Sequence, residues 1–248
     1  MKVVFHDDFY KVYTADPAAS AGRMEAIMAV IEPHVDIVTA QPAKEKDILK
    51  AHSRAHIENI SRAGLYDIAA LAAGGAVQTA VLGLDEPAFG LIRPPGHHAS
   101  RDSAWGFCYF NNMAIALQAL KHRGQLKSAY VLDIDLHYGD GTVNILESKG
   151  YVTVHNVAAP DRRSYLAEIE EGLREHPVDL IGISAGFDHH RDDWGSLLWT
   201  EDYFQIGKLV KAAANRNGGG CFGLLEGGYN HEILGDNVLA LINGLIER

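Results

Sequence analysis

The stretch VLDIDLHYGDG, residues 131–141, decides the fold and places charge where burial should be costly. Its first residues complete an apolar, β-branched run typical of a buried strand, and three aspartates and a histidine follow within eight positions. Uncompensated carboxylates are expensive to bury, so a strand that ends in them needs a counter-charge or hydrogen-bond donors. The stretch therefore predicts a strand whose carboxyl end lies at a functional site.

Short apolar runs of this kind alternate along the chain with longer stretches of helical periodicity. We predict strands at residues 2–5, 36–40, 88–92, 129–134, 151–155, 179–184 and 221–225. We predict helices at residues 20–32, 55–62, 66–83, 110–122, 164–175, 201–216 and 231–246. The alternation favours an α/β fold, with a mostly parallel sheet covered by helices on both faces, and a single domain over residues 1–248.

The composition narrows the class of partner. The chain has 248 residues, with 22 basic and 32 acidic side chains and a formal net charge of −10. This charge argues against binding to nucleic acid or to an anionic membrane surface, and it favours a cationic partner. The first residues lack the pattern of a signal peptide, and the sequence has no apolar run of about 18 residues. We therefore expect a cytoplasmic protein whose two cysteines are reduced and buried.

Four polar motifs each follow a predicted strand. They are RPPGHH (93–98), DIDLHYGD (133–140), FDHH (187–190) and EGGYN (226–230). The carboxyl ends of parallel strands lie along one edge of a sheet, where α/β proteins place their binding sites. We therefore expect the four motifs to meet in space, whereas antiparallel strands would separate them.

The second of these motifs has the spacing of a metal site. Asp135 and His137 are two residues apart, so in an extended strand their side chains emerge on the same face, together with that of Asp133. Two carboxylates and an imidazole suit Zn²⁺, with Fe²⁺, Co²⁺ or Mn²⁺ as alternatives. Asp188, at the next strand end, is the best candidate for the third ligand, which would leave a position open for water. Alone, the motif would equally fit solvated loop acids; its convergence with three others favours the metal site.

Two further motifs supply candidate proton donors and acceptors. His97 and His98 follow a rigid Pro-Pro-Gly turn, and the remaining acids Asp133 and Asp140 could each bond an imidazole Nδ1 and leave Nε2 facing a bound water. Tyr229 follows two glycines and could donate its phenol to a carbonyl oxygen. In isolation, adjacent histidines and a single tyrosine are more typical of surface or core positions.

Together these motifs resemble the histone deacetylase-like zinc amidohydrolases, which include the bacterial acetylpolyamine amidohydrolases. The resemblance runs from about residue 70 to the C-terminus and rests on RPPGHHA (93–99), GFCYFNN (106–112), DIDLHYGDGT (133–142), SAGFD (184–188) and LEGGYN (225–230). It is looser in GRMEAI (22–27) and AHSRAHI (51–57). It implies the arginase/deacetylase fold, in which a sheet of about eight mainly parallel strands lies between helical layers.

The resemblance also implies roles for individual residues. It assigns zinc to Asp135, His137 and Asp188, pairs His97 with Asp133 and His98 with Asp140, and makes Tyr229 the catalytic tyrosine. It places Gly106, Phe107 and Gly228 at the substrate, and a structural potassium ion near Asp133, Asp135, His137 and Thr153.

The motifs and the resemblance predict a zinc-dependent deacylase that hydrolyses an N-acetyl or other acyl amide of a lysine-like or polyamine-like amine. Tyr229 and the metal would polarise the amide carbonyl, and one of the two histidines, with His98 the first choice, would take a proton from water and return it to the amine. The substrate would be a small acylated amine or an acyl-lysine peptide. The alternatives are an arginase-like ureohydrolase with two metals and a non-catalytic acyl-amine binding protein.

Departures from the family pattern concern the entrance to the site. After residues 154–156 the chain lacks the aromatic proline–glycine loop that supplies the second wall of the acyl tunnel in the family. We therefore expect a wide, shallow site that admits bulky substrates or that another subunit completes in a homo-oligomer. Cys108 is a candidate wall residue without a base of its own, and His189, His190 and Trp194 are expected around a reshaped entrance.

Overall fold

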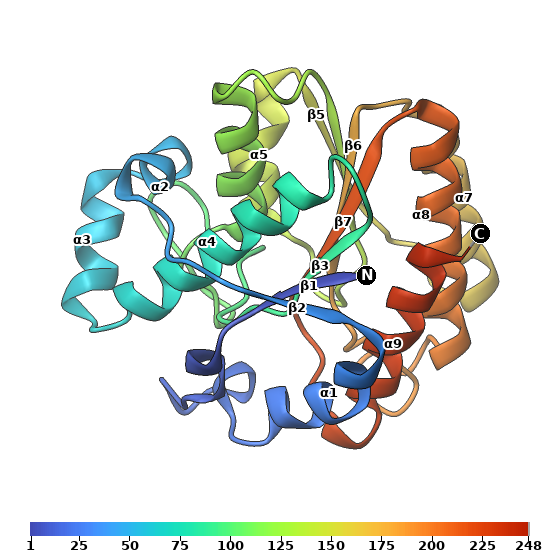
Figure 1. The fold of residues 1–248 in the computed structure, drawn as a ribbon, viewed down its shortest axis with the longest axis horizontal. Helices are drawn as coiled ribbons and strands as arrows, with labels where there is room; N and C mark the ends of the chain where they lie inside the picture. The colour runs from blue at the N-terminus through green and yellow to red at the C-terminus, as the bar shows by residue number, and fades with distance from the viewer. Residues whose placement is uncertain (248) are drawn as a thin grey trace.

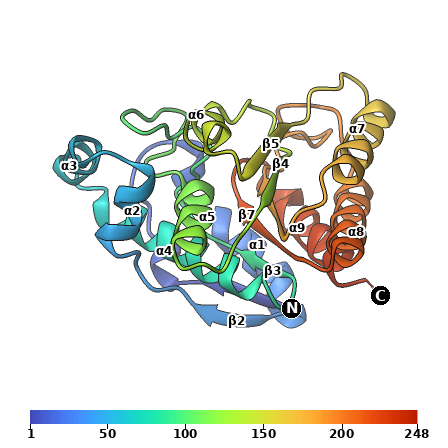
Figure 2. The same ribbon diagram turned by 90° about the horizontal axis from the view of Figure 1, so that it is seen from above.

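Seven strands form one sheet in the order β2-β1-β3-β7-β6-β4-β5, and every neighbouring pair is parallel (Figures 1 and 2). The structure is a computed structural model and describes residues 1–247. The strands are β1 (Lys2–Phe5), β2 (Asp36–Thr39), β3 (Ala88–Gly90), β4 (Ala129–Asp133), β5 (Val152–Asn156), β6 (Leu180–Ala185) and β7 (Gly220–Leu225). The predicted α/β class and parallel sheet are confirmed, but the sheet has seven strands rather than about eight.

Helices cover both faces of this sheet. The helices are α1 (Arg23–Ile31), α2 (Glu45–Ala51), α3 (Arg54–Arg62), α4 (Tyr66–Leu82), α5 (Asn112–His122), α6 (Asp140–Leu146), α7 (Arg162–Glu175), α8 (Thr200–Asn217) and α9 (His231–Ile246). Figure 1 shows α2, α3, α4 and α5 on one face, and α1, α7, α8 and α9 on the other. Short 3-10 turns are η1 (Asp7–Tyr10), η2 (Pro17–Ala19), η3 (Glu32–His34) and η4 (Glu147–Lys149).

The seven predicted helices are all present, and the differences have local causes. Helix α1 is shorter than the predicted span 20–32 because Pro33 lacks a backbone N–H and the chain continues as the 3-10 turn η3. Helices α2 and α6 were missed, since seven residues are too few to show a helical period. None of the helices within residues 1–247 combines the length and apolar composition that crossing a membrane requires.

The central strands form the core. Every residue of β4 and β6 is buried, as are all residues of β7 except its first. Parallel strands covered on both faces need a continuous apolar run rather than alternation, which explains why they are the clearest strand signals in the sequence. Each fully buried aliphatic side chain, such as that of Ile183, contributes about 1.5–3 kcal/mol to folding.

The order of the strands brings the four polar motifs together. Strands β3, β7, β6 and β4 are consecutive neighbours in the sheet, and each of the four motifs follows one of them. The register aligns their ends, with Asp133 beside Ser184 and Ser184 beside Leu224. Parallel pairing therefore places all four motifs along one stretch of the carboxyl edge, as predicted from the alternation of strands and helices.

A short segment follows β5, where the sequence lacks an aromatic loop. The Glu168 carboxylate, from α7, accepts the backbone N–H of Ala158 at 3.1 Å and that of Ala159 at 2.8 Å, and it also lies 2.9 Å from Nε2 of His155. Burial opposes ionisation, but these hydrogen bonds hold the pKa of Glu168 below its usual range. One carboxylate thus ties the segment to both α7 and β5.

Replacing Glu168 with glutamine should lower the free energy of unfolding by about 1–2 kcal/mol at pH 7, because charge-assisted hydrogen bonds become neutral ones. The pKa of Glu168 is lower in the folded chain than in the unfolded chain, where it is near 4.5. Its ionised carboxylate therefore stabilises the fold at pH values above 4.5, and this stabilisation is lost as the pH falls through the pKa of the folded chain. The difference in free energy of unfolding between the wild type and Glu168→Gln, measured by urea unfolding, should therefore become smaller as the pH falls. Glu171→Gln, an exposed residue of the same helix, is the matched control and should change stability by less than about 0.5 kcal/mol.

Candidate active site

Three side chains at the carboxyl ends of β4 and β6 form a cluster with the donors of a metal site. Asp135 and His137 follow β4, and Asp188 follows β6. One ligand atom from each residue lies within 4.8 Å of the other two. Both aspartates are buried, whereas the His137 side chain is 39% exposed and opens into a pocket. The structure thus brings together the three residues that the sequence predicts as metal ligands.

The imidazole of His137 lies between the two carboxylates. Its Nδ1 is 3.2 Å from Asp135 Oδ1 and 3.1 Å from Asp188 Oδ2. The hydrogen bond to Asp135 and the nearby Asp188 carboxylate raise the pKa of His137 to about 10. Burial and the neighbouring Asp135 raise the pKa of Asp188 to about 6. Two buried carboxylates this close together therefore favour a cation between them.

The donor set fits a divalent metal. Asp188 Oδ1 accepts the backbone N–H of Leu136 at 3.0 Å. Asp188 Oδ2 is buried and has no hydrogen-bond partner. It lies close to His137 Nδ1, but the two groups are not oriented for a hydrogen bond. Asp135 accepts the backbone N–H groups of His137 (2.9 Å) and Gly227 (2.8 Å). A Cβ at position 227 would lie 2.5 Å from Asp135 Oδ2, so glycine is needed there. Two carboxylates and one imidazole suit Zn²⁺ and also accept Fe²⁺ or Co²⁺.

Two histidine–carboxylate pairs flank this cluster. His97 Nδ1 lies 3.2 Å from Asp133 Oδ2, and His98 Nδ1 lies 2.8 Å from Asp140 Oδ1. These are the pairs that the resemblance implies. They differ in their contact with solvent, since the side chain of Asp133 is 1% exposed and that of Asp140 is 35% exposed.

The two imidazoles also differ in their charge state. Burial, followed by the charge of His97, lowers the pKa of His98 to about 4, so His98 is neutral at pH 7. Burial also opposes protonation of His97, but the carboxylates of Asp135 and Asp133 outweigh it and raise the pKa of His97 well above its usual value. A cation bound at Asp135 would oppose that shift. His98 is therefore the imidazole better suited to accept a proton at Nε2.

Tyr229 is held from two sides. Arg23 is fully buried and donates from Nε to the Gly228 carbonyl at 2.8 Å and from Nη2 to the Glu226 carbonyl at 2.7 Å. Its guanidinium also lies over the Tyr229 ring, 5.6 Å from the centroid. On the other side, Asp193 Oδ2 accepts the backbone N–H of Tyr229 at 2.7 Å. Burial raises the pKa of the Tyr229 phenol far above its usual value, so the group stays protonated and can donate.

A collar of rings surrounds a pocket of about 270 Å³. Neighbouring rings contact one another around the pocket, and a single glycine joins the last ring to the first. We call these rings the aromatic collar; in order around the pocket they are Trp105, His98, His137, Trp194, Tyr229 and Phe107. The centroids of successive rings are 3.8, 6.0, 6.0, 4.0 and 6.1 Å apart. Gly106 connects Phe107 to Trp105 along the chain. The Asp135–His137–Asp188 cluster and both histidines thus open into one small, aromatic-walled space.

The expectation of a wide, shallow site is therefore wrong, because Trp194 supplies a wall from another part of the chain. The loop after Asp188 folds back on itself, with the Gly195 N–H donating to the Asp188 carbonyl at 2.7 Å. Asp193 accepts the backbone N–H of Trp194 at 2.8 Å and also that of Tyr229, which holds the two ring-bearing segments together. The collar closes with residues of a single chain.

Two other predicted positions are corrected. Parallel pairing of β4 with β5 places Thr153 beside Tyr130, three residues before Asp133, or about 10 Å from the carboxyl edge. Asn156 is the residue beside Asp133, so Thr153 cannot share a potassium site with Asp133, Asp135 and His137. At the substrate pocket, Gly106 and Phe107 are lining residues as predicted, but Gly227 takes the place expected for Gly228, whose carbonyl faces Arg23.

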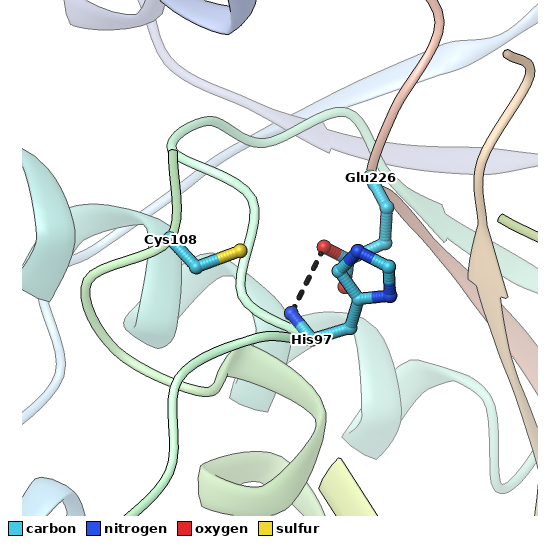
Figure 3. Close-up of side chains that lie close together, drawn as sticks. All are labelled: His97, Cys108 and Glu226. Carbon is cyan, nitrogen blue, oxygen red and sulfur yellow. Dashed lines mark hydrogen bonds between the residues drawn. The ribbon is translucent and has the colours of Figure 1, made fainter. Parts of the chain in front are cut away.

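A second cluster joins His97, which lines the pocket, with the buried side chains of Cys108 and Glu226 (Figure 3). Glu226 Oε2 accepts the backbone N–H groups of Gly96 at 2.7 Å and of His97 at 3.2 Å, and so fixes the turn that carries the histidines. Burial raises the pKa of Glu226 to about 7 and that of Cys108 well above its usual value. The Cys108 thiol is therefore protonated and buried, and it is not among the pocket-lining residues.

Sequence reasoning missed three supporting residues. Glu226 and Arg23 lie in quoted motifs, but nothing in their types indicates that both are fully buried and bonded to the backbone of the site. Trp105 directly precedes the motif GFCYFNN (106–112), and nothing in the sequence indicates that it contacts His98 and Asp140. His189 and His190, by contrast, lie away from the pocket: the ring of His189 packs against Tyr165 at 5.2 Å, and His190 Nδ1 accepts the Asp192 N–H at 3.1 Å.

Comparison with known proteins shows what the chain resembles. The histone deacetylase domain family matches residues 18–165. A probable deacetylase of Methanothermobacter thermautotrophicus is 30% identical over 305 aligned positions, covering 98% of this chain and 90% of that protein. The acetylpolyamine amidohydrolase of Burkholderia pseudomallei is 32% identical over 71% of this chain and 60% of that protein. The alignment with the first relative is longer than this chain, so that relative has insertions absent from it.

Among solved structures, the HD domain of HDA15 has the same fold. Its TM-score is 0.85 over 98% of this chain and 88% of that chain, at 22% sequence identity.

The cluster of Asp135, His137 and Asp188 should bind about one divalent metal ion per chain. Asp188→Asn should lose most of that metal after dialysis, because it removes the charge of the carboxylate that has an unpartnered oxygen. Elemental analysis by mass spectrometry measures the content directly. Asp192→Asn, an exposed acid of the same loop, is the control and should keep its metal. Full metal content in Asp188→Asn would contradict the assignment.

Proposed function

The chain belongs to the histone deacetylase domain family, and on that premise we propose that it is a metal-dependent deacylase that hydrolyses an N-acetyl or related amide of a lysine-like or polyamine-like amine. One observation carries the proposal. The Asp135–His137–Asp188 cluster, both histidine–carboxylate pairs and Tyr229 meet at one pocket of about 270 Å³. Residues 1–248 are proposed to form one catalytic domain around it.

Asp135, His137 and Asp188 would hold Zn²⁺, with Fe²⁺ or Co²⁺ as alternatives, and the ion would supply a Lewis acid for the amide carbonyl. Tyr229 would donate its phenolic proton to the same carbonyl oxygen as negative charge develops there, which is the role of an oxyanion-hole donor. Its raised pKa keeps the proton available over the whole neutral range.

His98 is proposed as the general base and then the general acid. With Nδ1 bonded to Asp140, its Nε2 would take the proton of the attacking water and return it to the departing amine. His97, held between Asp133 and the Asp135 carboxylate, would contribute electrostatic support. The Cys108 thiol is buried and protonated, so it is a poor nucleophile and no covalent intermediate is proposed on it.

The proposed substrate is a small acylated amine or an acyl-lysine side chain. The collar leaves space for a narrow alkyl chain between aromatic faces, and the net charge of −10 favours a leaving amine that is cationic. The acetylpolyamine amidohydrolase among the relatives supports the same class. An arginase-like two-metal reaction is disfavoured, because Asp133 and Asp140, the acids it would recruit, are bonded to His97 and His98.

Tyr229→Phe should lower kcat on an acetylated amine about a hundredfold or more while the metal content stays the same, since only the phenolic donor is removed. Steady-state kinetics and elemental analysis on the same preparation test this. Tyr138→Phe removes an exposed phenol close to the site and should leave kcat unchanged. Unchanged turnover in Tyr229→Phe would refute the role. A metal-loaded wild type that hydrolyses no acylated amine would favour the binding-protein alternative.

Trp194→Ala should widen the pocket and shift the preference among acyl groups. We expect the ratio of kcat/KM for a hexanoyl amide to that for an acetyl amide of the same amine to rise about tenfold. Trp194→Phe should give an intermediate ratio, and Trp199→Ala, outside the collar, should leave the ratio unchanged. An unchanged ratio in Trp194→Ala would show that Trp194 is not a wall of the acyl site.

A further inference from the structure

Trp105 contacts both members of the His98–Asp140 pair. Its indole Nε1 donates to Asp140 Oδ2 at 2.9 Å and also lies 3.2 Å from Asp140 Oδ1. The face of the same indole covers the imidazole of His98, with the ring centroids 3.8 Å apart and the planes inclined by 32°. One side chain thus restrains a carboxylate and the histidine bonded to it.

The His98–Asp140 pair is also the one that needs such support. Asp133, the partner of His97, is enclosed by protein, whereas Asp140 is the first residue of α6 and about a third of its side chain is exposed. A carboxylate in contact with water can rotate and exchange a protein donor for solvent, which weakens its hold on the imidazole. The indole shields Asp140 on one side and supplies a second donor to it.

The backbone around Trp105 fixes the indole in this place. Gly106 and Phe107 both have positive φ, 57° and 66°, and the Cys108 N–H donates to the Trp105 carbonyl at 3.0 Å. A Cβ on Gly106 would lie 2.3 Å from His98 Cδ2, so only glycine allows the chain to bend this closely around the imidazole. The turn therefore presents Trp105 directly over His98.

We propose that Trp105 is a positioning residue for the proposed reaction: its N–H orients the Asp140 carboxylate, which holds Nδ1–H of His98 and leaves Nε2 free toward the pocket. The inference rests on the proposed deacylase function. Burial opposes ionisation of Asp140, but hydrogen bonds from Trp105 and then His98 hold its pKa below the usual range, so the carboxylate stays charged. The charged carboxylate favours the tautomer of His98 that has its proton on Nδ1.

Trp105→Phe keeps a ring over His98 and removes the N–H donor. We expect kcat to fall about tenfold, the effect of one charge-assisted hydrogen bond, while KM changes less than about twofold. In an Asp140→Ala background, the same replacement should change kcat by less than about twofold, because the carboxylate that the N–H orients is gone. Equal losses of kcat in both backgrounds, or a raised KM with unchanged kcat, would show that Trp105 only lines the pocket.

The three tryptophans of the chain give a readout that does not depend on turnover. In ¹⁵N-labelled protein, each indole N–H gives one resonance, which single Trp→Phe variants assign. Asp140→Ala should shift the resonance of Trp105 more than those of Trp194 and Trp199, and should speed its exchange with water, because it removes the acceptor. An unmoved Trp105 resonance would overturn the proposal.

Trp199→Phe is the matched kinetic control, since Trp199 lies outside the collar and contacts the guanidinium of Arg191 at 3.8 Å. It should keep kcat and KM of the wild type. Metal content and urea unfolding of Trp105→Phe should also match the wild type, which excludes misfolding as the cause of a lower kcat. Failure of the deacylase proposal would appear as absence of turnover in metal-loaded wild type, and the Trp105 resonance would still decide whether the indole holds Asp140.

Discussion

Burial of four carboxyl groups at one edge of a sheet is the constraint on which the rest of the structure depends. Asp133, Asp135, Asp188 and Glu226 are all buried, and an ionised carboxylate without partners is costly in such a place. Backbone N–H groups donate hydrogen bonds to Asp135 and Glu226, and the imidazole of His97 is bonded to Asp133. Asp188 Oδ2 and Glu226 Oε1 are buried without a hydrogen-bond partner, and of these two acids Asp188 is the one that lies beside Asp135 and His137. The unpartnered oxygen of Asp188 supports the proposed cation site, and a metal bound there would contribute to the stability of the folded chain as well as to its chemistry.

The parallel sheet is what makes this concentration of charge possible. Four adjacent strands end at one level, so acids and histidines far apart in sequence meet without long connecting loops. Backbone N–H groups at those ends are free of the sheet and can face the carboxylates. Glycine at position 227 lets one such N–H approach Asp135 closely, and a Cβ there would also crowd Asp188. The parallel sheet thus both brings the acidic residues of the site together and supplies the backbone N–H groups that bond them.

Sequence patterns predicted the part of this arrangement that depends on period and order. The seven strands and the convergence of their polar ends follow from apolar runs and alternation, because a parallel sheet leaves few other topologies. The pairing of His97 with Asp133 and of His98 with Asp140 was available only through resemblance. What no pattern indicated were contacts that depend on where loops turn in space. Arg23 reaches the Glu226–Gly228 segment, and Trp194, which was expected near the entrance, stacks on Tyr229 and closes a side that was expected to be open. Thr153 was misplaced because the register of β5 is invisible in one sequence.

The aromatic collar has a further consequence for how a substrate enters. In many enzymes a flexible loop closes over the ligand, which costs ordering entropy and can limit the rate of turnover. Here the entrance is bounded by rings that are already held in place, Trp105 by its hydrogen bond to Asp140 and Trp194 by stacking on Tyr229. A ligand that fits this aperture would bind without the ordering cost of loop closure. The aperture is preformed, and its two largest lining side chains are the indoles of Trp105 and Trp194.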